Sequence, residues 1–211
     1  MTGSGPAADR DDMSTARTKT VTGLLREIRR CTVCAPHLDA GPRPIVQLGT
    51  GARIVIIGQA PGSRVHDSGV PWDDPSGERL RDWTGISATD FYDVSKVALL
   101  PMGFCYPGKG KGGDLPPRPE CAPLWHARAL ALLPEDRLTL LVGSYAQRHY
   151  LGARKNASLT DTVRNFSAAG TGQFPLPHPA WRSGIWMQRN PWFEADVLPA
   201  LRARVRERLT R

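Results

Sequence analysis

The sequence predicts an α/β protein, with a three-layer α/β/α fold around a central, mostly parallel four-stranded sheet. Four short apolar runs with the composition of buried strands recur along the chain, and segments with helical patterning lie between them. Strands that alternate with helices form a parallel sheet covered on both faces. Ligands of such sheets bind at the carboxyl ends of the strands, so we expect functional residues directly after each apolar run.

Each element follows from a local pattern. The helix at 21–30 has an apolar stripe, Leu24, Leu25 and Ile28, among charged residues, and the strand at 52–58 is a continuous apolar run closed by glycine. The predicted strands are 52–58, 97–100, 138–143 and, more weakly, 174–176. Further helices are predicted near 77–84, 121–133, 144–151, 159–165 and 194–209.

The chain is organised as a tail and one domain. Residues 1–19 are polar and rich in Gly, Ser and Thr, which predicts a disordered tail, and residues 20–211 form a single domain. No apolar run reaches the length of a membrane span, and the first residues lack the apolar stretch of a signal peptide. We therefore expect a cytoplasmic protein. A monomer is expected as well, because no heptad pattern or long apolar patch is present.

The charge balance favours a polyanionic partner. Lys and Arg outnumber Asp and Glu by 28 to 20, which gives a formal net charge of +8 and a pI near 9.8. An Arg-rich composition alone would give a similar excess. However, Lys109, Lys111, Arg182 and Arg189 lie in Gly/Pro-rich or irregular stretches, and loops are where binding groups concentrate.

Four cysteines form two pairs. Cys31 and Cys34 are separated by two residues, a spacing that lets both thiolates reach one centre, and Cys105 and Cys121 supply a second pair from far along the chain. In a reducing compartment such pairs more often bind metal than form disulfides. Zinc and an iron-sulfur cluster both fit this layout.

Two motifs follow predicted strands. Gly58–Gly62 is a Gly/Pro-rich turn that lets backbone amides approach a ligand, and Trp72 beyond it offers a flat face for a base. No Gly-Lys-Ser or Gly-Lys-Thr follows, which excludes a Walker loop. After the last strand, His178 lies between two prolines, a restricted backbone that suits a group presenting one ring nitrogen to a reacting atom.

Together these motifs resemble the uracil-DNA glycosylase superfamily, and within it the iron-sulfur-cluster branch of family 4 and family 5 enzymes. The resemblance covers residues 21–209 and rests on the order of the motifs. The matching segments are Gly58–Gly62, Pro71-Trp72, His178-Pro179 and Arg189-Asn190-Pro191. It implies a hydrolase that flips a uracil, and other deaminated bases, out of DNA and cleaves the glycosidic bond, leaving an abasic site in base excision repair.

The resemblance also implies roles for individual residues. His178 would donate a hydrogen bond to the uracil oxygen on which negative charge collects. Trp72 would stack on the base, and Gln59, Ala60 and Met102 would line its pocket. The residues implied at the DNA are Trp181, Arg182, Arg189 and Asn190, together with Lys109 and Lys111 near a phosphate path.

The sequence departs from the family pattern at three places. Gln59 and Ala60 stand where many relatives carry an acidic residue, so Asp73, then Asp67 and His66, are the candidates for activating water. The segment 99–104 has no Asn to read the uracil edge, and the stretch between His178 and Arg189 is longer than in the short family version. We therefore expect a subgroup with altered base preference or DNA engagement.

The resemblance favours a [4Fe-4S] cluster on Cys31, Cys34, Cys105 and Cys121, with zinc as the alternative, in a structural role. Two other functions stay open. One is a non-catalytic nucleic-acid or uracil-derivative binding protein on the same fold. The other is a metal-dependent hydrolase that uses His66, Asp67, Asp73 and Asp74, although 73–77 is also a common helix-capping turn with Ser76 or Asp74 as the cap.

Overall fold

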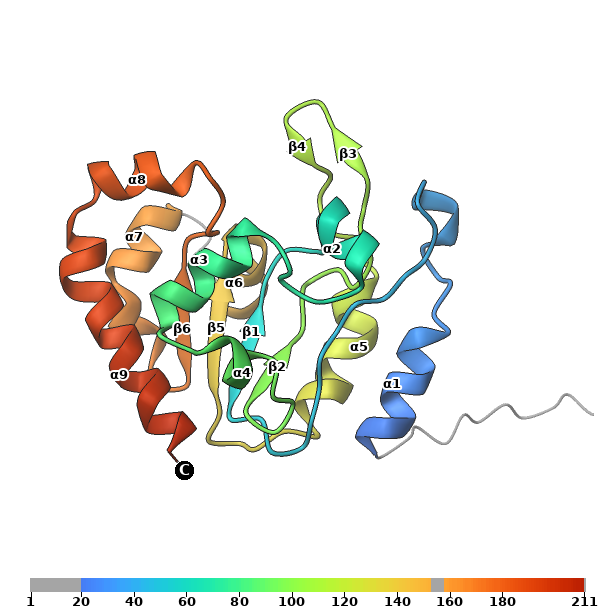
Figure 1. Ribbon diagram of the computed structural model, residues 1–211, viewed down its shortest axis with the longest axis horizontal. Coiled ribbons are helices and arrows are strands. Elements are labelled where there is room, and N and C mark those ends of the chain that lie inside the picture. Colours follow the sequence, from blue (N-terminus) through green and yellow to red (C-terminus); the bar gives the residue numbers. More distant parts are fainter. Residues whose placement is uncertain (1–19, 153–157, 211) are drawn as a thin grey trace, which may run out of the picture.

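The computed structural model describes residues 20–152 and 158–210, and the predicted disordered tail, residues 1–19, lies outside the described residues. Four parallel strands form the central sheet, and helices cover both of its faces, as the sequence predicts (Figure 1). The strands, in spatial order, are β2 Val97–Leu99, β1 Ile54–Ile57, β5 Leu138–Val142 and β6 Gln173–Leu176.

Successive strand residues face opposite layers, which gives the sheet two cores. Ile54 and Ile56 of β1 pack toward α3 and α9, whereas Val55 and Ile57 pack toward α1, α5 and α6. All four of these side chains are fully buried. The principal covering helices are α3 Pro75–Thr84, α9 Leu198–Leu209, α1 Val21–Arg29, α5 Cys121–Leu130 and α6 Ser144–Tyr150.

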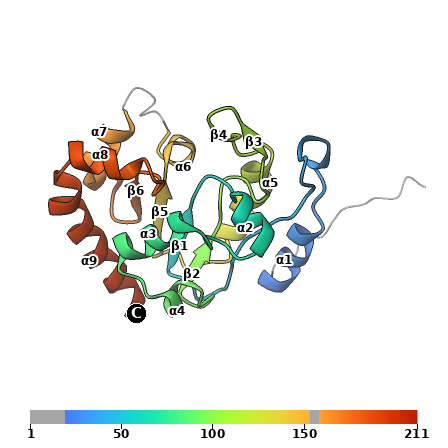
Figure 2. The ribbon, with the colours of Figure 1, turned by 45° about the horizontal axis from the view of Figure 1, so that its top comes forward.

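Several short elements were not predicted. A two-stranded antiparallel hairpin, β3 Lys109–Gly110 and β4 Gly113–Asp114, projects beyond the carboxyl ends of the sheet (Figures 1 and 2). The remaining elements are α2 Ser63–Ser68, α4 Ala88–Phe91, α7 Leu159–Arg164, α8 Ser183–Arg189, the 3₁₀ turns Ala35–His37 and Phe166–Ala169, and a π turn at Phe193–Val197. Of these, α7 was expected from the sequence, and the π turn coincides with the start of the helix predicted at 194–209.

The prediction of an irregular segment around Arg189 was wrong, because Arg189 is the last residue of α8. This helix lacks the usual sequence signal of a beginning, since Arg182 at its N-cap position makes no side-chain capping hydrogen bond. Trp186 and Met187 instead hold the helix against the core that contains β1 and α9. Tertiary packing rather than local propensity therefore defines α8.

Candidate functional site

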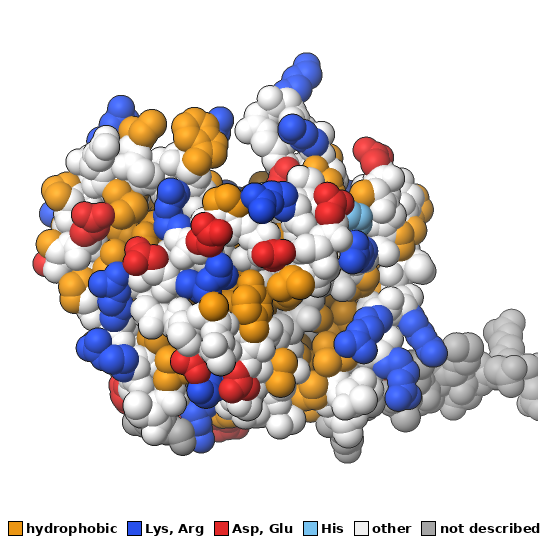
Figure 3. All heavy atoms as spheres, viewed as in Figure 1, with side chains coloured by type: hydrophobic (Ala, Val, Ile, Leu, Met, Phe, Trp, Pro, Cys, Tyr) orange, Lys and Arg blue, Asp and Glu red, His pale blue; other side chains and the backbone are white. Residues whose placement is uncertain are grey.

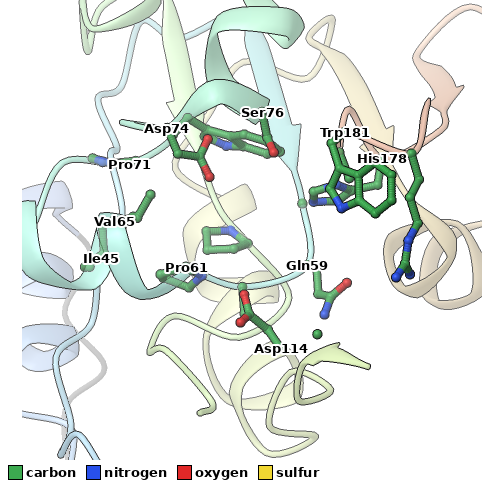
Figure 4. Close-up of a pocket in the computed structure, with 18 of the residues that line it drawn as sticks. Ile45, Gln59, Pro61, Val65, Pro71, Asp74, Ser76, Asp114, His178 and Trp181 are labelled. Carbon is green, nitrogen blue, oxygen red and sulfur yellow. The ribbon is translucent and has the colours of Figure 1, made fainter. Parts of the chain in front are cut away.

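A cavity of about 500 Å³ lies at the carboxyl ends of the strands. Gly58 to Gly62 form its floor directly after β1, Pro101 follows β2, and His178 follows β6. The hairpin contributes Gly112 to Asp114 on another side. In Figure 4, His178 and Trp181 lie at one side of the cavity and Ile45 and Val65 at the other. The cavity thus occupies the position that the fold class predicts for a ligand.

Two glycines leave the space that Trp72 occupies. A Cβ on Gly58 would lie 2.6 Å from Cζ2 of the Trp72 ring, and a Cβ on Gly77 would lie 1.8 Å from the Trp72 carbonyl oxygen. Trp72 has φ 58°, the only positive φ of a non-glycine residue in the described ranges. Its ring stacks on His178 with a centroid separation of 5.9 Å and an interplanar angle of 29°. Only glycine at 58 and 77 leaves room for this placement.

His178 lies in a partly buried position beside Trp72. Burial lowers its pKa below the ordinary value, and the nearby Asp74 carboxylate raises it by a smaller amount. On the sheet side, a Cβ on Gly143 at the end of β5 would lie 3.4 Å from the Cβ of His178. The ring is therefore enclosed between β5 and Trp72, and near neutral pH it can present an N–H group without carrying charge.

Two carboxylates line the cavity. Asp74 is the N-cap of α3, and its Oδ1 accepts a hydrogen bond of 2.8 Å from the Gly77 amide. Asp114 comes from the hairpin, and its Oδ2 lies 3.4 Å from the position of a Cβ on Gly62. Figure 4 shows the two on different sides of the cavity. Desolvation and the Asp74 charge raise the pKa of Asp114, while Lys109 lowers it.

The residues predicted to activate water lie elsewhere. Asp73 is exposed and does not line the cavity. His66 of α2 packs against the Tyr106 ring at 5.9 Å, outside the cavity lining, and Asp67 is exposed on the same short helix. The extended backbone of Asp74, with φ −155° and ψ 173°, accounts for its difference from Asp73, because neighbouring residues in extended backbone point in opposite directions.

Of the residues predicted to touch the base, Gln59, Ala60 and Trp72 line the cavity and Met102 does not. Met102 is 8% exposed and packs in the core that contains α1 and α5. Its amide donates a 2.9 Å hydrogen bond to the Gly58 carbonyl, which turns the preceding residue, Pro101, toward the cavity. Side chains alternate in direction beyond β2, so Pro101 lines the cavity in place of the predicted Met102.

The predicted DNA-contacting residues lie on two projections beside the cavity. Trp181 is 72% exposed, and the Arg182 guanidinium lies 5.0 Å from its ring centroid; both line the cavity mouth. Lys109 and Lys111 are exposed on the hairpin. Figure 3 shows the surface notched between the hairpin and the segment near α8. Farther away, Arg189 is exposed at the end of α8, and Asn190 bonds to the Trp186 carbonyl at 2.8 Å.

The four cysteines converge from three parts of the chain. Cys31 follows α1, Cys105 lies in the loop after β2, and Cys121 begins α5; with Cys34 they line one small cavity and form no disulfide. Burial raises the pKa of Cys105 to about 11 and that of Cys121 to about 12. Four neighbouring thiols suit a thiolate-binding metal centre. Among the described residues, however, no group of three or more His, Cys, Asp or Glu side chains is arranged to hold a metal ion.

The fold and the cavity define a class: an α/β protein with a nucleotide-sized site at the carboxyl ends of a parallel sheet, between two basic projections. The chain belongs to the uracil DNA glycosylase superfamily, whose family model matches residues 46–202, well over half of its length. The match begins after Cys31 and Cys34, so it does not include the first cysteine pair. No helix in the described ranges has the length and hydropathy to cross a lipid bilayer.

Proposed function

We propose that the protein is a DNA glycosylase that flips uracil, and other deaminated bases, out of DNA and hydrolyses the glycosidic bond. It is supported above all by His178, which stacks on Trp72 with a pKa lowered by burial, in a cavity large enough for an extruded nucleotide. Membership of the superfamily supports it. The reaction adds water across the bond between the base and C1′ of the sugar and yields a free base and an abasic site.

The pKa of His178 is lowered by burial, which favours the neutral imidazole that this chemistry needs. As the glycosidic bond breaks, its electron pair moves onto the base, and negative charge collects on the base oxygens. A neutral imidazole donates its N–H hydrogen bond to such an oxygen without transferring a proton in the ground state. In mutagenesis of comparable sites, one donor to a developing oxyanion contributes about 3 kcal/mol.

We assign the water-orienting role to Asp74 instead of Asp73. Asp74 combines a carboxylate in the cavity with an electrostatic interaction with His178. The Gly77 amide fixes one of its oxygens and leaves the other to hold a water and to stabilise positive charge on the sugar. Water attacks C1′ and loses a proton, which the Asp74 carboxylate would accept.

The two projections would hold the DNA. Trp181 is exposed and stiffened by the Arg182 guanidinium stacked on its ring, which suits a wedge that occupies the space left by the flipped base. Lys109 and Lys111 on the opposite projection would contact phosphates. Arg189 and Asn190 are less direct: we propose that Arg189 contacts phosphate at the end of α8, and that Asn190 holds the end of this helix through Trp186.

We further propose a [4Fe-4S] cluster on Cys31, Cys34, Cys105 and Cys121, with zinc as the alternative. Their common cavity and their sulfur-only donor set support a thiolate centre. The centre would tie α1 and α5 to the segment leading to the hairpin. Visible absorbance with iron and sulfide stoichiometry supports the cluster, whereas a colourless protein with one equivalent of zinc contradicts it.

A second candidate function is non-catalytic binding of nucleic acid or uracil derivatives. It is favoured by Gln59, which stands where many relatives carry an acidic residue. The Gln59 side-chain amide lies 3.4 Å from the Leu115 carbonyl. This contact connects the Gly58–Gly62 turn to the hairpin. Gln59 has no carboxylate that could activate water. The two functions predict the same DNA affinity and differ in turnover.

The test uses an end-labelled oligonucleotide with one uracil, followed by alkali to reveal abasic sites. We expect strand breaks with the parent protein and at least a 100-fold slower reaction with His178→Ala. The matched control is His149→Ala, because His149 is exposed on α6 outside the cavity lining. DNA binding without strand breaks supports the binding function, and equal rates for the parent and His178→Ala contradict the role of His178.

A further inference from the structure

Arg79 of α3 reaches across the cavity wall to the segment that follows His178. Its Nη1 donates to the Ala180 carbonyl at 2.5 Å, to the Ser183 hydroxyl oxygen at 3.0 Å and, more weakly, to the Pro179 carbonyl at 3.4 Å. The side chain is only partly accessible to solvent. A single guanidinium nitrogen thus connects α3 with the backbone of the turn that carries His178.

The Ala180 carbonyl that accepts from Arg79 also accepts hydrogen bonds from within the turn. Ser183, which is 5% exposed, donates from its hydroxyl to the Ala180 carbonyl at 2.5 Å, and its amide donates to the same oxygen at 2.9 Å. The Ala180 carbonyl therefore collects three donors, one of them a permanent cation. Removing Arg79 would leave the Ser183 bonds, which are internal to the turn, and would release the turn from α3.

Within residues 20–152 and 158–210, the hydrogen bonds between α3 and the turn 179–183 all come from Arg79. Pro177 and Pro179 restrict the backbone around His178 but have no amide hydrogens to bond to a neighbouring element. The ring of His178 lies beside Trp72 and Gly143, and the Trp72 carbonyl packs against Gly77 of α3, so Arg79 supplies the polar part of the connection between the turn and α3. Since Asp74 begins the same helix, the distance between the two proposed reacting groups depends on this connection.

We propose that Arg79 is a positioning residue: its hydrogen bonds to the turn 179–183 fix His178 relative to Asp74 at the start of α3. This inference rests on the proposed glycosylase function for its kinetic consequence, but not for its structural one. Arg79 does not line the cavity, and it acts through the backbone of the turn. Displacements of about 1 Å between reacting groups lower rates by about 100-fold.

The electrostatic influence of the charged groups around His178 must be distinguished from positioning by Arg79. Asp74 from α3, Asp114 from the hairpin and Arg182 from the same turn all line the cavity with His178. Burial is the largest cause of the lowered His178 pKa, so Arg79→Met is expected to raise this pKa by admitting water, and it also removes one positive charge. Arg79→Lys retains the charge but loses the planar fork, and it isolates the geometric contribution.

The experiment compares Arg79→Met and Arg79→Lys with the matched control Arg202→Met. Arg202 also donates to backbone carbonyls of α3, those of Trp83 and Asp82 at 3.2 and 3.0 Å, far from the turn. Each variant is assayed for single-turnover uracil excision, and the His178 imidazole is titrated by NMR. We expect both Arg79 variants to react about 10- to 100-fold more slowly at saturating protein, with a raised His178 pKa, and Arg202→Met to match the parent in both readouts.

Each other outcome overturns the inference. Full rescue by Arg79→Lys means that charge alone matters, and an unchanged His178 titration in both Arg79 variants means that the turn does not depend on Arg79. Should Arg79→Met not fold, Arg79→Lys decides by the same two readouts. Should the parent cleave no DNA, the proposed function fails, while the His178 titration still tests the positioning role by itself.

Discussion

Replacing Gly58 with alanine would displace Trp72 and thereby test the core of the site. The added Cβ would lie 2.6 Å from Cζ2 and 3.3 Å from Cη2 of the Trp72 ring. The backbone of Gly58 is not in the left-handed region, so alanine is tolerated there apart from this contact. Gly58→Ala is therefore a local change that acts on one ring.

The size of the displacement follows from the contact distances. Ordinary carbon contacts begin near 3.4 Å, so the ring must retreat by at least 3.4 − 2.6 = 0.8 Å. The backbone of Trp72 cannot follow, because its carbonyl lies against Gly77, so the ring must tilt toward His178 or into the cavity. We expect a loss of about 1–3 kcal/mol of stability from overpacking and about a 100-fold lower excision rate from misplacement.

The assay is single-turnover excision of uracil, with thermal unfolding measured alongside. Gly172→Ala is the control, since a Cβ there meets nothing closer than the Arg137 carbonyl at 3.8 Å. The double variant Gly58→Ala, Trp72→Phe should regain stability, because phenylalanine lacks the atoms that clash. If Gly58→Ala excises uracil within twofold of the parent rate, Trp72 does not need the observed orientation and the reasoning is wrong.

Three further predictions concern separate parts of the molecule. Asp74→Asn keeps the α3 cap, so the melting temperature should hold while kcat falls at least 100-fold. If Asp73→Asn lowers kcat more than Asp74→Asn does, Asp73 orients the water instead. Exchanging Lys109 and Lys111 for Gln should lower the salt dependence of DNA binding by about one unit of log–log slope each, and an unchanged slope excludes phosphate contacts. His126 is buried, and its pKa is lowered to about 4 from 6.5. About 3 kcal/mol of folding stability, complete above pH 6.5, should therefore be lost as the pH falls toward 4. Urea unfolding at several pH values measures this loss, and the same pH dependence in His126→Leu would refute it.

The sequence was sufficient for the strands because buried parallel strands are continuous apolar runs, and the runs at 52–58 and 138–143 contain β1 and β5. It was insufficient for α8 and the hairpin, whose positions depend on contacts with distant segments. The hairpin is attached partly through Gln59 and the Leu115 carbonyl, a contact across 56 residues. Convergence of the cysteines on one cavity was expected from their spacing and from the family resemblance.

The placement of the Asp74 carboxylate in the cavity could not be predicted from the sequence. Asp73 and Asp74 are neighbours of identical chemistry, and motif spacing cannot distinguish them. Their difference arises from the first turn of α3: the Gly77 amide needs a capping acceptor, Asp74 supplies it, and the extended backbone at this position directs Asp73 outward. The same side chain that satisfies the helix end is thereby placed in the cavity.

This makes α3 the element that aligns the proposed reacting groups. Asp74 begins the helix, the absence of a side chain at Gly77 admits the Trp72 carbonyl, and Arg79 holds the turn after His178. The three contacts fall within six consecutive residues. A shift of the first turns of α3 would therefore move the Trp72 ring, the Asp74 carboxylate and the His178 imidazole together. Substitutions at these positions should therefore be non-additive in catalysis, whereas a change at Arg202, which contacts the far end of α3, should combine additively with each of them.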